Sequence, residues 1–197
     1  MKKWIASALF LLNGCGNYFV VQDWSSVRII LTRSVCFGAC PDYRVELRGD
    51  GTVIYEGWHD VLVPGRHLSK VDHRELEALI SEFRRANFFF LRNRYAAGAT
   101  DGPTTELQLT IDGRTKFVTD YLGSSIGMPQ AVTRLEQAVD VAAHTDRWVR
   151  GDDQTIAELQ RGGVQPRSQE GGTVLANAAE RGRSDLVRWL VAEGAPL

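Results

Sequence analysis

The stretch of this sequence with the clearest potential for chemistry is a pair of cysteines, Cys36 and Cys40. Gly38 lies between them, and Pro41 and Tyr43 follow. Bridged cysteines have Cα atoms about 4.4–6.8 Å apart, whereas four residues of strand span about 13 Å. A disulfide here therefore requires a tight bend, and Gly38 supplies the backbone freedom for one.

The residue types allow four interpretations of this pair. The first is a structural disulfide, which would stabilise the fold by about 2 kcal/mol because the loop is short. The second is a redox-active pair, although thiol oxidoreductases generally use Cys-x-x-Cys at a helix start, where the helix dipole lowers the thiol pKa. The third is a metal site that also uses His59 or His67. The fourth is a pair of reduced, buried thiols.

Other catalytic signals are absent from the sequence. It has no Gly-x-Ser-x-Gly, His-Glu-x-x-His or phosphate-binding Gly-x-x-x-x-Gly-Lys motif. We therefore predict no catalytic residue, no metal ligand and no cofactor. The candidate ligand loop is Thr100–Thr104, in which Asp101 and Thr104 could act together with Asp120. The ordinary role of such aspartates is to cap turns.

The N-terminus predicts export. Lys2 and Lys3 precede the short apolar run Trp4–Leu12, and Gly14-Cys15 follows. This resembles the bacterial lipobox, which implies cleavage before Cys15 and a diacylglyceryl group on its thiol. An ordinary signal peptide is the alternative.

Export changes how the remaining cysteines are interpreted. With Cys15 lipidated, Cys36 and Cys40 form an even pair in an oxidising compartment, which favours the structural disulfide. Gly16 stands where family rules place an inner-membrane retention aspartate, so the outer membrane is favoured over the inner one. We predict a lipid-anchored protein of the bacterial cell envelope that faces the periplasm.

Composition supports a folded protein and argues against nucleic-acid binding. The chain has 197 residues, of which 44% are hydrophobic and 24% charged, and its formal net charge is −1. A nucleic-acid interface needs clustered Lys and Arg, and no basic segment stands out. The length suits one ordinary domain with a small appendage.

The first half of the chain has the pattern of hairpins followed by a helix. Apolar and polar residues alternate in the segments before and after the cysteines, and Asp-Gly turns favour hairpins. A capping box at Asp72 and Glu75 begins a helix that ends near Ala86. Phe88–Leu91 would pack that helix end against the sheet. The predicted strands are Val27–Thr32, Tyr43–Leu47, Val53–Trp58, one near His59–Val63, and an extended piece that ends at Val71.

The second half repeats this organisation. After a loop over Arg92–Pro103, strands are predicted over Glu106–Ile111 and Arg114–Tyr121. A helix with Pro129 in its first turn would end near Trp148. We therefore predict an α+β domain, with an antiparallel sheet of hairpins and helices on one face.

Three motifs resemble those of an uncharacterised bacterial domain family. They are Cys36–Tyr43, which follows a Cys-x-Gly-x-Cys-Pro-x-Tyr pattern, then Gly49–Val53, and Thr100–Thr104. The resemblance covers residues 27–149. It implies a domain of unknown function and therefore no activity, substrate or catalytic residue.

The C-terminal segment has a weak internal repeat. Asp153–Val164 aligns with Ser184–Ala195 at an offset near the ankyrin period, and Gly172–Gly182 resembles the first ankyrin helix. The resemblance implies a small all-α segment. About three such repeats are needed to fold alone, so we expect this one to pack beside Trp148, where it could also bind a protein partner.

These observations divide the chain into a signal peptide (1–14), a tether (15–26), an α+β domain (27–149) and an ankyrin-like segment (151–197). We predict a membrane-anchored envelope lipoprotein that is a non-enzymatic binding or interaction module. The alternative is a thiol-redox or metal-assisted envelope enzyme that uses Cys36 and Cys40.

Overall fold

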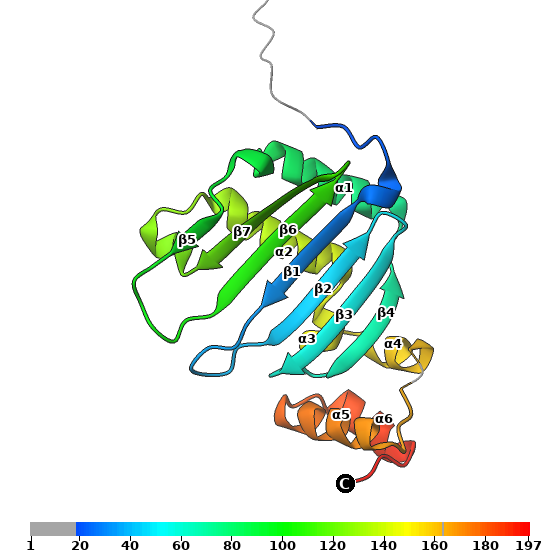
Figure 1. Cartoon of the computed structure of the whole chain (residues 1–197). Helices are drawn as coiled ribbons and strands as arrows, with labels where there is room; N and C mark the ends of the chain where they lie inside the picture. Colours follow the sequence, from blue (N-terminus) through cyan, green and yellow to red (C-terminus); the bar gives the residue numbers. More distant parts are fainter. Residues whose placement is uncertain (1–18, 163) are drawn as a thin grey trace, which may run out of the picture.

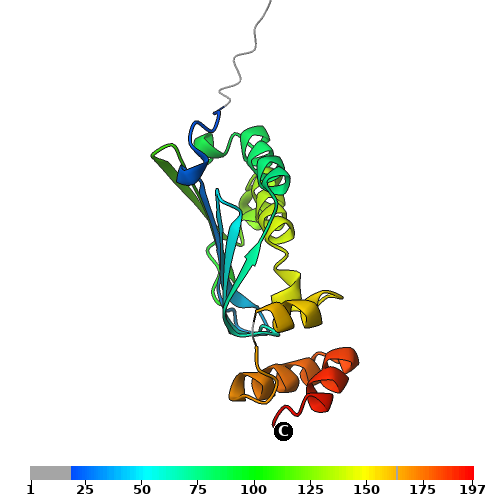
Figure 2. The same cartoon turned by 90° about the vertical axis from the view of Figure 1, so that its right-hand side faces the viewer.

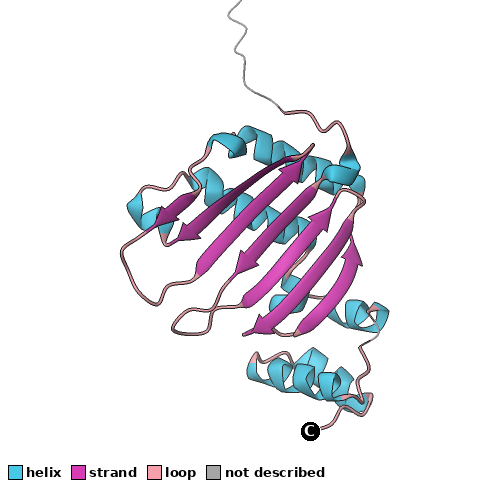
Figure 3. Cartoon of the chain, viewed as in Figure 1, coloured by secondary structure: helices cyan, strands magenta, loops and turns pink. Residues whose placement is uncertain are grey.

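The computed structural model describes residues 19–162 and 164–197, and it shows a mixed α+β protein (Figures 1 and 3). Seven strands form one sheet in the order β4-β3-β2-β1-β6-β7-β5. This confirms the predicted fold class. The predicted signal peptide and the lipidation site Cys15 lie outside the described residues.

The sheet is antiparallel except at one edge. Every neighbouring pair is antiparallel apart from β5 and β7, which run parallel. The central strand, β1, pairs with β2 on one side and with β6 on the other. The strands are β1 (Arg28–Arg33), β2 (Asp42–Arg48), β3 (Thr52–His59), β4 (Gly65–Lys70), β5 (Arg94–Ala96), β6 (Thr104–Ile111) and β7 (Arg114–Tyr121).

The two long helices of the α+β part lie on the same face of the sheet, as Figure 2 shows. Among the described residues, no helix covers the opposite face. The α-helices are α1 (His73–Arg85), α2 (Gln130–Ala143), α3 (Asp146–Val149), α4 (Thr155–Arg161), α5 (Gln169–Glu180) and α6 (Ser184–Ala192). The 3₁₀ turns are η1 (Trp24–Ser26), η2 (Phe88–Phe90) and η3 (Gly123–Ile126).

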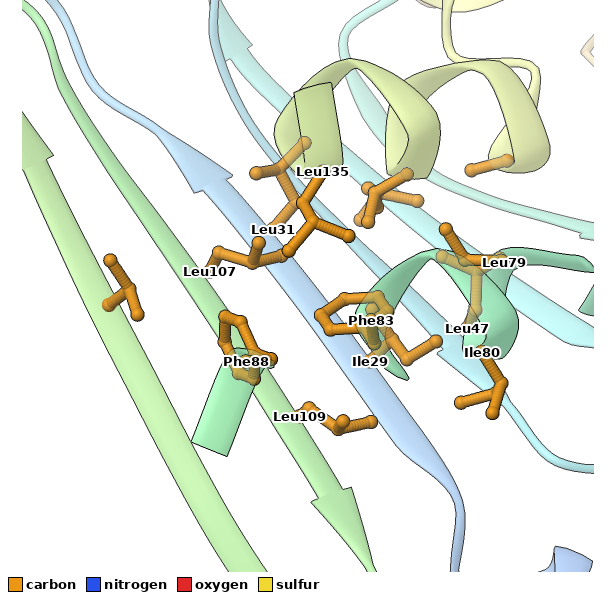
Figure 4. Close-up of a cluster of buried hydrophobic side chains, with 14 of the residues drawn as sticks. Ile29, Leu31, Leu47, Leu79, Ile80, Phe83, Phe88, Leu107, Leu109 and Leu135 are labelled. Carbon is orange, nitrogen blue, oxygen red and sulfur yellow. The ribbon is translucent and has the colours of Figure 1, made fainter. Parts of the chain in front are cut away.

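The main core fills the space between the sheet and these two helices (Figure 4). Strand register brings apolar residues into line, because Leu31 lies opposite Val45 of β2 and Leu107 of β6. Phe83 of α1 and Leu135 of α2 pack onto this row from above and are almost completely buried. Alternation along the strands thus places one apolar face beneath the helices.

Several local predictions are confirmed. The Asp72 side chain accepts a hydrogen bond from the Glu75 N–H (2.9 Å), and Glu75 in turn accepts one from the Asp72 N–H (3.1 Å). This is the predicted capping box. Both Asp-Gly turns are present, since Gly51 and Gly113 adopt φ values of 77° and 75°, which favour glycine.

The predicted strand near His59–Val63 is wrong. Asp60 has a φ of 51°, which ends the strand, and the next residues turn away from the sheet. The N–H groups of Leu62 and Val63 donate to the carbonyls of Val149 and Trp148 (2.9 Å each). This segment therefore pairs with α3, and the buried run of Val and Leu reflects that contact.

Three further predictions need correction. The helix that begins after Pro129 stops at Ala143, because His144 adopts a left-handed conformation (φ 51°) that separates it from α3. The predicted loop over Arg92–Pro103 contains the short strand β5. Of the phenylalanine cluster, Phe88 is buried, whereas Phe90 is 67% exposed.

The C-terminal helices close a second core at the lower end of the sheet in Figure 1. Tyr55 of β3 and Trp148 share this core with Leu186 and Leu190 of α6. The Asn177 side-chain amide donates to the carbonyls of Val61 (3.2 Å) and Leu62 (3.1 Å). The segment after residue 151 thus packs against the sheet end and Trp148.

The helices of the described residues are all too short or too polar to cross a membrane. The predicted division of the chain at residue 150 stays a prediction, because the second core draws residues from both sides of it.

Candidate functional site

The candidate site is a polar network at the end of β1, beneath α2. Arg33, the last residue of β1, points to the helix-covered face, as Ile29 and Leu31 do. Its guanidinium donates from Nη2 to Asp140 Oδ2 (2.7 Å), from Nε to the same oxygen (3.1 Å), and from Nη1 to Thr105 Oγ1 (3.2 Å). Asp140 therefore ties the C-terminal half of α2 to the central strand.

The second oxygen of Asp140 is also occupied. The Tyr43 hydroxyl donates to Asp140 Oδ1 (2.6 Å), and so does the Thr145 hydroxyl (2.9 Å). Arg33 Nε lies 3.0 Å from the Tyr43 oxygen, which completes a closed ring of hydrogen bonds. Each oxygen of Asp140 thus has two donors, so this carboxylate is built to hold its neighbours in place.

The network changes the pKa values of its members. Burial favours the neutral form of Tyr43, and the Asp140 charge adds to this, so the pKa of the Tyr43 hydroxyl is well above its ordinary value. Burial alone would lower the pKa of Arg33, but Asp140 and Tyr43 outweigh it, so the net shift is upward. Tyr43 thus stays protonated and Arg33 stays charged at neutral pH.

Glu136 lies one helical turn before Asp140, but its carboxyl group is not paired as that of Asp140 is. It is 4% exposed, and its Oε1 has no hydrogen-bond partner. Burial raises the pKa of Glu136 to about 7; the Asp120 and Asp140 charges act in the same direction and Arg33 opposes them. Glu136 is therefore a buried carboxyl that gains or loses its proton near neutral pH.

A hollow of about 450 Å³ opens beside this network. Polar groups of Arg33, Asp140 and Thr145 line one part of it, and Pro41, Pro103 and the exposed Val141 line another. The volume lies in the range of small-molecule sites in proteins. The remaining lining residues are Ser34, Cys40, Tyr43, Thr105, Gln137, Asp146, Val149 and Arg150.

The disulfide between Cys36 and Cys40 is confirmed, with Cα atoms 5.6 Å apart. Gly38 has a φ of 151°, which side chains other than glycine rarely adopt, so it supplies the predicted bend. The Phe37 N–H donates to the Asp101 carbonyl (3.0 Å). The bridged loop is thereby fixed against the Thr100–Thr104 loop.

None of the predicted ligand residues Asp101, Thr104 and Asp120 is among the residues that line the hollow. The Thr104 backbone forms two hydrogen bonds with Ser34: the Ser34 N–H donates to the Thr104 carbonyl (3.0 Å), and the Ser34 hydroxyl accepts from the Thr104 N–H (3.0 Å). Asp120 accepts a hydrogen bond from the Gly123 N–H (2.6 Å) and acts electrostatically on Glu136. Asp101 contributes its carbonyl, as described above. Within the described residues no contact joins Asp101 to Asp120.

Sequence reasoning missed Arg33, Glu136 and Asp140, although a signal for them exists. Arg33 occupies the next alternate position of β1 after the buried residues Ile29 and Leu31. Glu136 and Asp140 are four residues apart, on the helix face that also carries Val132 and Val139. A charged residue at an expected core position is the informative pattern, because an isolated charge is rarely buried there without a partner or a function.

Of the two histidines named as possible metal ligands, His59 is exposed at the end of β3 and His67 has other contacts. The His67 ring is buried, stacks on Trp148 with centroids 4.9 Å apart, and lies 2.9 Å from the Pro64 carbonyl through Nε2. Across residues 19–162 and 164–197, His, Cys, Asp and Glu side chains nowhere gather in a group of three that could hold a metal ion.

A second charged cluster lies on the open face of the sheet. Glu46 of β2 is 1% exposed and forms ion pairs with Arg28 (2.7 Å), Arg44 (2.8 Å) and Arg48 (2.9 Å). Burial alone would raise the pKa of Glu46, but the three guanidinium groups lower it to about 2. Glu46 is therefore permanently charged at neutral pH.

Comparison with known proteins identifies a family to which no function is assigned. A family model described as a domain of unknown function (DUF6438) matches residues 27–143. None of the curated proteins matches the chain.

Proposed function

The chain belongs to the DUF6438 family, and because that family is a domain of unknown function, we propose a function from the site itself. We propose that the protein is a non-enzymatic binding module of the bacterial cell envelope. Its α+β domain takes a small polar molecule into the hollow beside Arg33 and Asp140.

The observation that carries this proposal is the convergence of three distant segments on one hollow. Pro41 and Tyr43 come from the cysteine motif, Pro103 comes from the Thr100–Thr104 loop, and Asp140 comes from α2. The Tyr43 hydroxyl donates to Asp140, and the Phe37 N–H donates to the Asp101 carbonyl, so the three segments are joined without a ligand. A preformed, partly polar hollow of about 450 Å³ suits a small ligand.

The chemistry of the lining favours binding over catalysis. The raised pKa of Tyr43 keeps its hydroxyl protonated, and both oxygens of Asp140 are engaged by donors. Cys40 lines the hollow but is bonded to Cys36, so it offers no thiolate. The observed groups are therefore suited to donate and accept hydrogen bonds at fixed positions.

The proposal also assigns a location. The lipobox-like residues before Cys15 support a lipid anchor, and Gly16 after it supports an outer-membrane position that faces the periplasm. A bonded Cys36–Cys40 pair fits an oxidising compartment. Residues 151–197 would act as an ankyrin-like segment that packs beside Trp148, and the surface of α6 would be available to a protein partner.

The binding proposal is tested by thermal-shift measurements on the mature lipidated protein, with a panel of amino acids, sugars and short peptides. Ligands that raise the Tm of the wild type are expected to lose this effect in Val141→Trp, because Val141 is 74% exposed and lines the hollow. The matched control is Val191→Trp, on α6, where the side chain is 51% exposed. A shift that survives in Val141→Trp, or a panel without any shift, would contradict the proposal.

The anchor is tested by metabolic labelling with a palmitate analogue. Label is expected on the wild type and should disappear in Cys15→Ala. The alternative, a thiol-redox or metal-assisted enzyme, is tested by alkylation and mass spectrometry of protein taken from its own compartment. A fully oxidised Cys36–Cys40 pair favours the binding module, whereas a reactive thiol or bound zinc favours the enzyme.

A further inference from the structure

The upper end of the molecule in Figure 1, opposite the hollow, carries an aromatic and basic pocket. We infer that this pocket, formed by Phe19, Arg84, Phe89, Phe90 and Arg114, binds the headgroup region of an anionic phospholipid membrane. The inference rests on the proposed lipid anchor and adds the face of the protein that meets the membrane. The pocket has a volume of about 310 Å³, and Asn87 and Phe88 complete its lining.

Contacts within the pocket place two cations beside aromatic rings. The Arg114 guanidinium lies 4.2 Å from the centroid of the Phe89 ring, and that of Arg84 lies 5.4 Å from the centroid of Phe19. Arg84 Nε also donates to the Phe19 carbonyl (2.7 Å). Aromatic rings beside cationic side chains are the combination that suits the membrane interface, where apolar and phosphate groups meet.

Both pocket cations are available to an anion. Among the described residues, neither Arg84 nor Arg114 forms an ion pair with a carboxylate. The acidic groups nearest in sequence are already engaged. Glu82 pairs with Arg85, and Asp112 accepts from the N–H groups of Gln22 and Asp23 (3.0 Å each). An anionic surface would therefore complement the pocket.

Apolar side chains project from the same end. Phe90 is 67% exposed and Val20 is 64% exposed, although most large apolar residues of the fold are buried. Phe19 is held in place because its ring packs edge-on against Phe89, with centroids 5.2 Å apart. The chain therefore enters the folded domain at this pocket.

The short chain between the proposed lipid anchor and Phe19 favours a membrane as the binding partner of this pocket. Cys15 precedes Phe19 by four residues, which span at most about 14 Å when extended. A diacylglyceryl group on Cys15 would thus hold the pocket within reach of the lipid headgroups. Cationic side chains near an anionic surface are attracted to it, so the pocket would orient a protein that the anchor retains.

The test uses the mature lipidated protein, in which the lipid on Cys15 and the Cys36–Cys40 disulfide leave an introduced thiol as the only one free to carry an environment-sensitive fluorophore. Phe90→Cys places the probe in the pocket, and Val191→Cys places it on α6, at the other end of the molecule (Figure 1). With phosphatidylglycerol vesicles, the probe at residue 90 is expected to shift its emission to the blue and the probe at residue 191 to remain unchanged. Adding Arg84→Gln and Arg114→Gln should abolish the shift, and phosphatidylcholine vesicles should give a smaller one.

The intact mass of the same samples shows whether Cys15 carries lipid, so failure of the membrane face can be told apart from failure of the proposed anchor. Lipidated protein that is bound to vesicles without a shift at residue 90 would overturn the membrane face and leave the anchor standing. A shift that survives the two arginine substitutions would also overturn it. An intact mass without lipid would refute the anchor. The face is then tested in the Cys15→Ala form, where residue 90 or 191 carries the only label: an arginine-dependent shift at residue 90 supports the face, and its absence overturns it.

Discussion

Glu46 and Glu136 are both buried glutamates, yet their pKa values are shifted in opposite directions. Glu46 lies on the open face of the sheet, where three arginines surround it and lower its pKa to about 2. Glu136 lies on the buried face of α2, where burial and two carboxylates raise its pKa to about 7. At neutral pH, Glu46 carries a full charge, whereas Glu136 is near its midpoint.

The difference shows that the surrounding charges decide the direction of the net pKa shift, because burial acts in the same direction on both carboxyls. Burial is the largest single influence on both groups, and in both it favours the neutral form. Strand register lets arginines from β1 and β2 reach Glu46, since Arg28 lies directly opposite Arg48. Around Glu136, Arg33 is already bound to Asp140 and compensates little.

The largest effect is expected from Glu46→Gln, which removes the charge that holds three arginines together. The free energy of unfolding should fall by about 2–3 kcal/mol at pH 7, because paired cations are left without their anion. The folded-state pKa of Glu46 is lowered from 4.5 to about 2. Its stabilisation is therefore present above pH 4.5 and is lost as the pH falls towards 2. Urea unfolding between pH 3 and pH 8 measures this, and equal stabilities at pH 7 would contradict it.

Glu136→Gln should have the opposite sign. The folded-state pKa of Glu136 is raised from 4.5 to about 7, so its contribution is fully present below pH 4.5 and is lost as the pH rises through 7. The variant, which cannot ionise, should therefore be more stable than the wild type by about 2 kcal/mol at pH 8.5. Near pH 4 the two proteins should have similar stability. Urea unfolding at the two pH values is the measurement, and a variant that is less stable at pH 8.5 would refute the raised pKa.

Tyr43→Phe tests how much the closed network beside Glu136 contributes. It removes the hydroxyl that donates to Asp140 Oδ1 at 2.6 Å. A hydrogen bond to a charged acceptor contributes about 1.5–3 kcal/mol, and Thr145 still donates to the same oxygen, so we expect a loss of about 1.5 kcal/mol. Chemical unfolding at pH 6 measures it. The phenylalanine ring keeps the packing against Tyr55, so a loss above about 3 kcal/mol would point to core disruption instead.

The smallest effect is expected from Arg66→Ala, on the same open face as Glu46. Arg66 pairs with Glu56 at 3.7 Å, and its side chain is 57% exposed. Such exposed pairs contribute less than about 0.5 kcal/mol, because water screens them. A Tm change within about 2 °C would match this expectation. A larger loss would mean that the arginines of this face act as one network.

Local features were predictable from the sequence, and contacts between distant segments were not. The Asp72 capping box and the two Asp-Gly turns depend on neighbouring residues, so their patterns identify them. Arg33 and Asp140 are 107 residues apart, and their pairing depends on how α2 crosses the sheet. The apolar run Val61–Val63 has the composition of a strand, and only its contact with α3 explains its burial.

The second core has a consequence for the order in which the protein can be completed. Asn177 donates to the Val61 carbonyl, 116 residues earlier in the chain, and Leu186 and Leu190 belong to the same core as Tyr55. The ribosome synthesises the sheet before the C-terminal helices. The sheet end that carries Tyr43 and Tyr55 is therefore exposed to solvent until α5 and α6 have been made. Long-range contacts of this kind form slowly, and the exposed apolar surface attracts other chains meanwhile. Folding is therefore complete only when about the last thirty residues have packed. We expect chains that terminate before them to aggregate.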